Sequence, residues 1–179
     1  LSGGLTRRHV FLLEGSPGTG KTTISLQFLI EGAKRGESCL YISLSESEEE
    51  LRDSAASHNM VLHENIEIFE LVPPESLLNE EQQQSLLYSS DLELGETTKR
   101  IFEAFEAINP ERVVVDSLSE IRLLAQSSLR YRRQLLAMKH YFVRQGATVL
   151  LLDDLTSDML DKTVHSIVHG VIQLEELAP

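Results

Sequence analysis

The sequence lacks several features that define other classes of protein. It holds a single cysteine, Cys39, so no disulfide framework can form within the chain. Cys39 lies in an apolar run beside Leu40 and Tyr41, which predicts a buried, inert thiol rather than a reactive one. This use of cysteine indicates a reducing, cytoplasmic compartment.

Neither a signal peptide nor an apolar run of membrane length is present, so the sequence predicts no association with a membrane. Basic residues are also scarce, since 16 Lys and Arg against 28 Asp and Glu give a net charge of −12. Phosphate backbones bind clusters of Lys and Arg, so this balance argues against nucleic acid as a partner of the whole chain. The densest basic patch comprises Arg130, Arg132, Arg133 and Arg144. We interpret it as a solvated face of a helix, with a binding surface as the alternative.

The length and apolar content of the chain limit its domain organisation. At 179 residues and 41% hydrophobic content, it is long enough for one α/β core and too short for two typical domains. We therefore expect residues 1–179 to form a single domain. Because the chain starts at Leu1 rather than Met and stops at Pro179 just after a strand-like segment, we also expect it to be excised from a longer protein.

Predicted strands and helices alternate along the chain, which is typical of a parallel sheet with crossover helices. The strands are expected at residues 10–14, 38–44, 66–71, 112–115, 147–152 and 168–174. The helices are expected at residues 21–34, from a cap at Ser45 or Ser47 through Ala56, and at 96–108 and 129–145. Residues 72–94 have no clear period and are interpreted as a partly helical, mobile excursion. The predicted fold class is α/β, a mainly parallel twisted sheet flanked by helices on both faces.

A phosphate-binding loop follows the first predicted strand. Its eight residues match the pattern G-x-x-x-x-G-K-[ST] and open the first predicted helix. In such a loop the glycines let backbone N–H groups curl around a polyphosphate, while Lys21 reaches the β- and γ-phosphates and the Thr22 hydroxyl holds Mg²⁺. The helix dipole adds to the affinity for anions. The predicted nucleotide-binding residues are Gly15, Ser16, Pro17, Gly18, Thr19, Gly20, Lys21, Thr22 and Thr23.

Carboxylates at the ends of other predicted strands would complete a nucleotide site. Asp116 ends the apolar run from Val113, where it would accept a hydrogen bond from a Mg²⁺-bound water; the alternative is an ordinary aspartate that caps a turn. Glu46, after the second strand, is our candidate for the group that orients the attacking water. Asp153 and Asp154 end another strand at the same edge, and either sense the γ-phosphate, complete the Mg²⁺ shell or are plain strand-terminal acids.

Three segments together resemble the RecA-type P-loop ATPases, and most closely the KaiC-like branch. They are Gly3-Gly4-Leu5, the phosphate-binding loop and Val113-Val114-Val115-Asp116-Ser117-Leu118, and the resemblance extends over nearly the whole chain. It implies a RecA-like core, ATP and Mg²⁺ bound at subunit interfaces, a homo-oligomeric hexameric ring, slow ATP hydrolysis and, in some domains, self-phosphorylation on Ser or Thr.

Two departures from the KaiC-like pattern bear on activity. KaiC-like domains carry two adjacent glutamates after the second strand, the first acting as the water-activating base, whereas this chain has Ser45 followed by Glu46. Either Glu46 takes over that role, or hydrolysis is weak and the domain mainly binds nucleotide. The basic segment that follows the last strand of such domains is also absent. Ser166 aligns with the phosphorylated pair of the family and is a candidate acceptor, with a plain hydroxyl before a strand as the alternative.

Three functional hypotheses follow. The first is a ring-forming regulatory ATPase in which Lys21 binds phosphate, Thr22 and Asp116 place Mg²⁺, and Glu46 positions the water. The second is a nucleotide-gated module with vestigial hydrolysis that docks a signalling protein. The third is a relative of DNA recombinases with residues 118–133 as the strand-contacting loop, which the acidic balance weakens.

Overall fold

A single parallel sheet organises the computed structural model, which describes residues 4–71, 86–155 and 163–176. The sheet has six strands in the order β3-β2-β4-β5-β1-β6, and all neighbouring strands are parallel. The strands are β1 (Val10–Gly15), β2 (Cys39–Ser43), β3 (Ile66–Glu70), β4 (Arg112–Asp116), β5 (Thr148–Asp154) and β6 (Gly170–Leu174).

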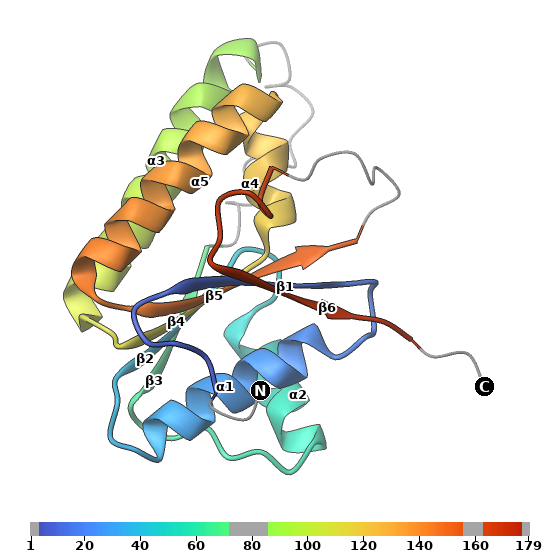
Figure 1. Cartoon of the computed structure of the whole chain (residues 1–179), viewed down its shortest axis with the longest axis vertical. Coiled ribbons are helices and arrows are strands. Elements are labelled where there is room, and N and C mark those ends of the chain that lie inside the picture. The colour runs from blue at the N-terminus through green and yellow to red at the C-terminus, as the bar shows by residue number, and fades with distance from the viewer. Residues whose placement is uncertain (1–3, 72–85, 156–162, 177–179) are drawn as a thin grey trace.

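Helices cover both faces of this sheet (Figure 1). One face carries α1 (Lys21–Ala33) and α2 (Glu48–Ser57), and the other carries α3 (Leu86–Ile108), α4 (Leu118–Ala125) and α5 (Ser128–Gln145). The prediction of a parallel sheet flanked by helices on both faces is therefore confirmed. In the described part of the chain, no helix combines the length and the apolar character needed to cross a bilayer.

Strand β4 shows how the two apolar layers arise. Val113 and Val115 enter the layer beneath α3, α4 and α5, whereas Val114 enters the layer beneath α1. A strand buried on both faces needs apolar residues at consecutive positions, which explains the unbroken valine run. Cys39, which is 0% exposed, lies in the α1 layer as predicted, and burial raises the pKa of its thiol to about 12.

The cap of α2 is Ser47, one of the two predicted candidates. Its hydroxyl accepts a hydrogen bond from the backbone N–H of Glu50, and the Glu50 carboxylate accepts one from the backbone N–H of Ser47 at 2.7 Å. This reciprocal pair satisfies two N–H groups at the helix start. Because the helix begins only after Ser47, Ser45 and Glu46 lie in the turn between β2 and α2.

Two sequence-based expectations need correction. Helix α3 begins at Leu86, well before the predicted start at Glu96. The prediction began too late because glycine disfavours helical backbone, yet Gly95 lies inside this helix. The third hypothesis placed a strand-contacting loop at residues 118–133, but most of these residues lie in α4 and α5. Helix α5 has its own cap, the Ser127 hydroxyl, which accepts a hydrogen bond from the backbone N–H of Arg130. Residues 72–85 of the predicted excursion lie outside the described residues.

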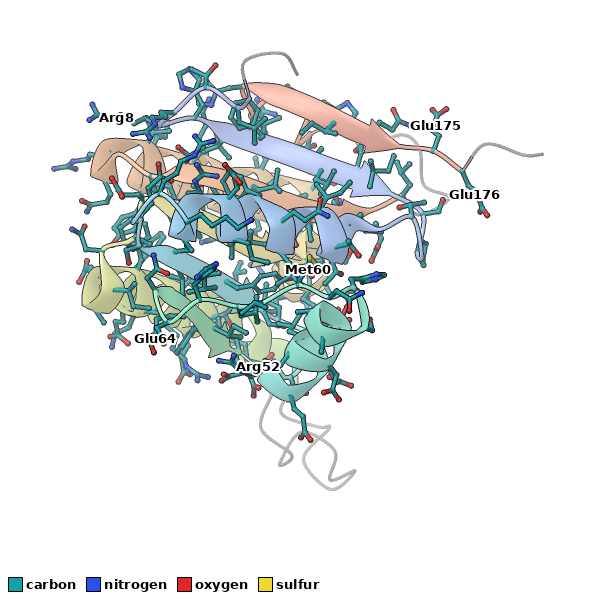
Figure 2. The ribbon with its side chains drawn as sticks, turned by 90° about the horizontal axis from the view of Figure 1, so that it is seen from below. Arg8, Arg52, Met60, Glu64, Glu175 and Glu176 are labelled. Atoms are coloured by element: carbon teal, nitrogen blue, oxygen red, sulfur yellow. The ribbon has the colours of Figure 1, made fainter. Side chains whose placement is uncertain are left out.

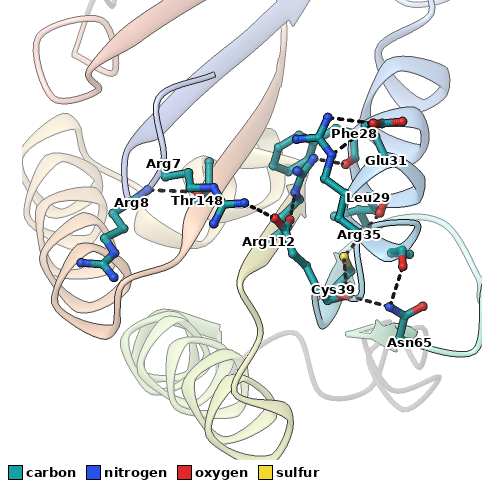
Figure 3. A network of polar contacts seen from close by, with 12 residues as sticks. Arg7, Arg8, Phe28, Leu29, Glu31, Arg35, Cys39, Asn65, Arg112 and Thr148 are labelled. Carbon is teal, nitrogen blue, oxygen red and sulfur yellow. Dashed lines mark hydrogen bonds and ion pairs between the residues drawn. The ribbon is translucent and has the colours of Figure 1, made fainter. Parts of the chain in front are cut away.

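A polar network ties together the amino ends of the strands (Figure 3). Arg112, at the start of β4, donates to the Glu37 carboxylate and to the backbone oxygen of Phe28 at 2.7 Å. Arg7 donates to the other oxygen of Glu37 at 2.6 Å. The network fixes the end of the molecule opposite the phosphate-binding loop.

Figure 2 views the molecule from the side of α1 and α2, where charged residues such as Arg52 and Glu64 line the surface.

Candidate nucleotide site

The loop between β1 and α1 has the backbone that its glycines predict. Gly18 and Gly20 have φ values of 84° and 91°, a left-handed conformation that favours glycine. A Cβ atom at Gly15 would lie 2.5 Å from the Thr19 hydroxyl oxygen, so only glycine fits there without a shift. Gly20 caps α1 without a side-chain hydrogen bond, which leaves the first N–H groups of the helix available to an anion.

Lys21 is buried at the start of α1, with its ammonium group turned back along the loop. Its Nζ donates to the backbone oxygens of Gly15 at 2.8 Å and Ser16 at 3.0 Å. It also pairs with Asp154 Oδ1 at 2.9 Å. The loop therefore brings the predicted phosphate-binding lysine to the end of β5, and Asp154 meets it there.

Asp116 lies at the carboxyl end of β4 on the same face of the sheet as α1. The Tyr41 hydroxyl donates a hydrogen bond to Asp116 Oδ2 at 2.5 Å. Burial raises the pKa of Asp116, while this hydrogen bond and the positive charge of Lys21 oppose that rise. Sequence reasoning missed Tyr41 as a site residue, because a tyrosine in a buried strand resembles an ordinary core residue.

The residues present fit a magnesium ion. Thr22 follows Lys21 in the first turn of α1, and the charge of Lys21 acts on Asp116 across the site. A threonine hydroxyl, a carboxylate and phosphate oxygens are hard oxygen ligands of the kind Mg²⁺ prefers. Thr22 and Asp116 are thus the residues that would hold the ion or its bound water.

Glu46 sits in the turn after β2, next to the end of β4. The backbone N–H of Glu46 donates to the Ser43 hydroxyl at 3.0 Å, and residue Ser43 pairs in register with Asp116. Glu46 Oε2 is buried, and among the described residues it has no hydrogen-bond partner. Burial raises the pKa of Glu46, and the negative charges of Asp116 and Glu50 raise it further. Buried polar atoms normally have a hydrogen-bond partner, so Glu46 Oε2 needs one that the described residues do not supply.

The raised pKa of Glu46 predicts a pH-dependent cost in stability. Because the folded protein holds this proton more tightly than the unfolded chain, the contribution of Glu46 to the free energy of unfolding falls as the pH rises above about 4.5. Glu46→Gln removes the charge, so we expect the variant to be at least as stable as the wild type at pH 7.5 and the difference to shrink at pH 4.5. Urea unfolding of both proteins at the two pH values measures this. A variant clearly less stable than the wild type at pH 7.5 would contradict it.

Asp153 and Asp154 take different roles although they are adjacent. Asp153 points to the opposite face of the sheet from Asp154, where it accepts hydrogen bonds from Arg122 and, at 3.1 Å, from the Ser119 hydroxyl. Its partners therefore come from α4, and the structure favours the reading of Asp153 as a strand-terminal acid. The same face carries the pair between Glu14 Oε2 and His165 Nε2 at 2.8 Å.

A large cleft lies at the other end of the sheet, near the amino ends of β4 and β5. Its volume is about 1480 Å³, and its lining includes Leu5, Phe28, Met60, Arg112 and Thr148. None of the predicted nucleotide-binding residues lines it. The phosphate-binding loop and this cleft are thus separate features of the molecule.

Comparisons with known proteins agree with this geometry. A family model described as "ATPase: KaiC" matches residues 1–178. A UPF0273 protein of Pyrococcus horikoshii is 27% identical over 175 residues, which cover 96% of this chain and 70% of that protein. The circadian clock oscillator protein KaiC of Parathermosynechococcus lividus is 30% identical over 134 residues, 72% of this chain and 22% of that protein. The crystal structure of a KaiC-like protein of Pyrococcus horikoshii superimposes with a TM-score of 0.74 at 25% identity, covering 96% of this chain and 73% of that one.

Proposed function

The chain belongs to the KaiC ATPase family, and from that premise we propose that it binds Mg-ATP and hydrolyses it slowly as a subunit of a ring-forming regulatory ATPase. The observation that carries the proposal is the position of Lys21, which is buried at the end of a glycine loop with its Nζ on the backbone oxygens of Gly15 and Ser16. A buried cation beside free helix N–H groups favours a polyphosphate ligand.

Each site residue has a distinct role in this proposal. The loop amides of residues 15–20 and the Lys21 ammonium bind the β- and γ-phosphates, and Thr22 and Asp116 hold Mg²⁺. The ion, when bound, neutralises charge on the phosphates. Glu46 accepts a hydrogen bond from the attacking water and orients it, because the turn that holds Glu46 lies beside the carboxyl end of β4.

Assembly and partners form the second part of the proposal. By the resemblance, the chain would act in a homo-oligomeric, hexameric ring with ATP at the subunit interfaces, and a signalling protein would read its state. Self-phosphorylation is proposed at Ser166, whose exposed hydroxyl accepts a hydrogen bond from Arg132 at 2.9 Å. Mass spectrometry after incubation with Mg-ATP tests for this phosphorylation, and a Ser166 without phosphate would contradict the proposal of self-phosphorylation.

A second candidate function is a nucleotide-gated interaction module with vestigial hydrolysis. Its support is Ser45, which is exposed at the position where KaiC-like domains carry the first glutamate. In that case, bound ATP would act as a signal, and its hydrolysis would contribute little.

Phosphate release at several protein concentrations separates the two functions. We expect turnover of Mg-ATP per subunit to rise with protein concentration, because a site completed across an interface needs a neighbouring subunit. Lys21→Ala serves as the blank. Wild-type turnover no higher than this blank at any concentration would contradict the ATPase and favour the interaction module.

A further inference from the structure

Tyr41 is a fully buried tyrosine whose hydroxyl reaches the site. It lies in the middle of β2, and its side chain is 0% exposed within the apolar layer beneath α1. Its hydroxyl donates to Asp116 Oδ2, on the neighbouring strand β4, at 2.5 Å. One oxygen of the Asp116 carboxylate is thus engaged by a neutral donor from within the core.

The presence of the hydroxyl needs a reason beyond packing. A phenylalanine would fill the same apolar space without burying a polar group, and a buried hydroxyl is costly unless it has a partner. A tyrosine phenol has an ordinary pKa of about 10, so it keeps its proton and stays a donor at neutral pH. The hydroxyl is therefore explained by its hydrogen bond to the Asp116 carboxylate and not by packing in the core.

We propose that Tyr41 is a positioning residue of the metal site: its hydrogen bond to Oδ2 fixes the orientation of the Asp116 carboxylate and leaves Oδ1 to accept a hydrogen bond from a metal-bound water. This rests on the proposed function, because it assumes that the site takes a nucleotide with a divalent cation. Donors that orient the carboxylates of a metal site commonly change its affinity for the metal by about 10- to 100-fold.

The test compares Tyr41→Phe with the wild type, using Mn²⁺ as the probe. Free Mn²⁺ is measured by electron paramagnetic resonance in the presence of protein and a non-hydrolysable ATP analogue. Binding of the analogue without metal is measured separately in a chelator. We expect the Mn²⁺ dissociation constant of Tyr41→Phe to rise about tenfold, while the metal-free affinity for the analogue stays at the wild-type value.

Tyr131→Phe is the matched control. Tyr131 is also buried, and its hydroxyl accepts a hydrogen bond from Arg122 on the opposite face of the sheet. This variant loses a buried tyrosine hydroxyl as well, so we expect a similar loss of stability but an unchanged Mn²⁺ affinity. If both variants lost Mn²⁺ affinity equally, the loss would come from a general destabilisation of the fold and not from the bond to Asp116, and the proposal would be overturned.

The remaining outcomes separate this proposal from the function on which it rests. A wild-type protein that binds no nucleotide, with or without metal, overturns the proposed function and this inference with it. A wild-type protein that binds both, combined with Tyr41→Phe at wild-type Mn²⁺ affinity, overturns the role of Tyr41 alone. If Tyr41→Phe does not fold, Tyr41→Met replaces it, because methionine also lacks the hydroxyl and adapts to irregular apolar space. An unchanged Mn²⁺ affinity in that variant overturns the inference.

Discussion

Lys21→Ala is expected to weaken ATP binding about a hundredfold or more. Lys21 Nζ is the buried cation of the phosphate-binding loop, and a hydrogen bond to a charged group contributes about 1.5–3 kcal/mol. Two such contacts, to the β- and γ-phosphates, exceed the roughly 2.8 kcal/mol that corresponds to a hundredfold change. Titration calorimetry of both proteins with ATP measures the effect.

Lys34→Ala provides the control for the loss of a positive charge. Lys34 follows the same helix and is exposed at its far end, so its removal changes the net charge equally but leaves the loop intact. We expect this variant to bind ATP like the wild type. Equal loss of affinity in the two variants, or retention of affinity in Lys21→Ala, would mean that the loop does not bind phosphate in this protein.

Glu46→Gln is expected to lower ATP turnover by about 10²- to 10⁴-fold while ATP affinity stays unchanged. Glutamine keeps the shape of the side chain but cannot take a proton from water, and a positioned general base contributes about that factor. The variant also keeps the hydrogen bonds of the turn, which Glu46 makes through its backbone to Ser43. Steady-state phosphate release and ATP titration together separate catalysis from binding.

Glu49→Gln is the matched variant for this experiment. Glu49 is exposed in the first turn of α2, a few residues from Glu46. We expect it to turn over ATP at the wild-type rate. If Glu46→Gln also did so, Glu46 would have no part in hydrolysis, and a residue contributed by another subunit would have to orient the water.

Local patterns were enough to predict the fold and the phosphate-binding loop. A strand buried on both faces reads as an apolar run, as at Val113 to Val115, and these runs marked the central strands in advance. The loop is equally local, because its glycines and Lys21 are close in the sequence. Even the choice of Ser47 as the α2 cap rests on a spacing of three residues to Glu50.

Contacts between distant segments could not be predicted in this way. The bond from Tyr41 to Asp116 depends on the register of β2 against β4, and the pair of Lys21 with Asp154 depends on β5 lying beside β1. Neither register can be predicted from the residues that neighbour one position in the sequence. The helix α4 was missed within residues 118–133 for a related reason. It is stabilised by the burial of Leu118 and Ile121 against the sheet, which is also a contact between segments distant in the sequence.

Under the proposed function, the ion pair between Lys21 and Asp154 makes nucleotide binding an exchange reaction. A polyphosphate would displace the carboxylate from the lysine, so its observed affinity would be reduced by the free energy of the bond that it breaks. A ligand that also accepts hydrogen bonds from the amides of the loop can offset the loss of this ion pair, whereas a ligand that contacts only the ammonium group cannot.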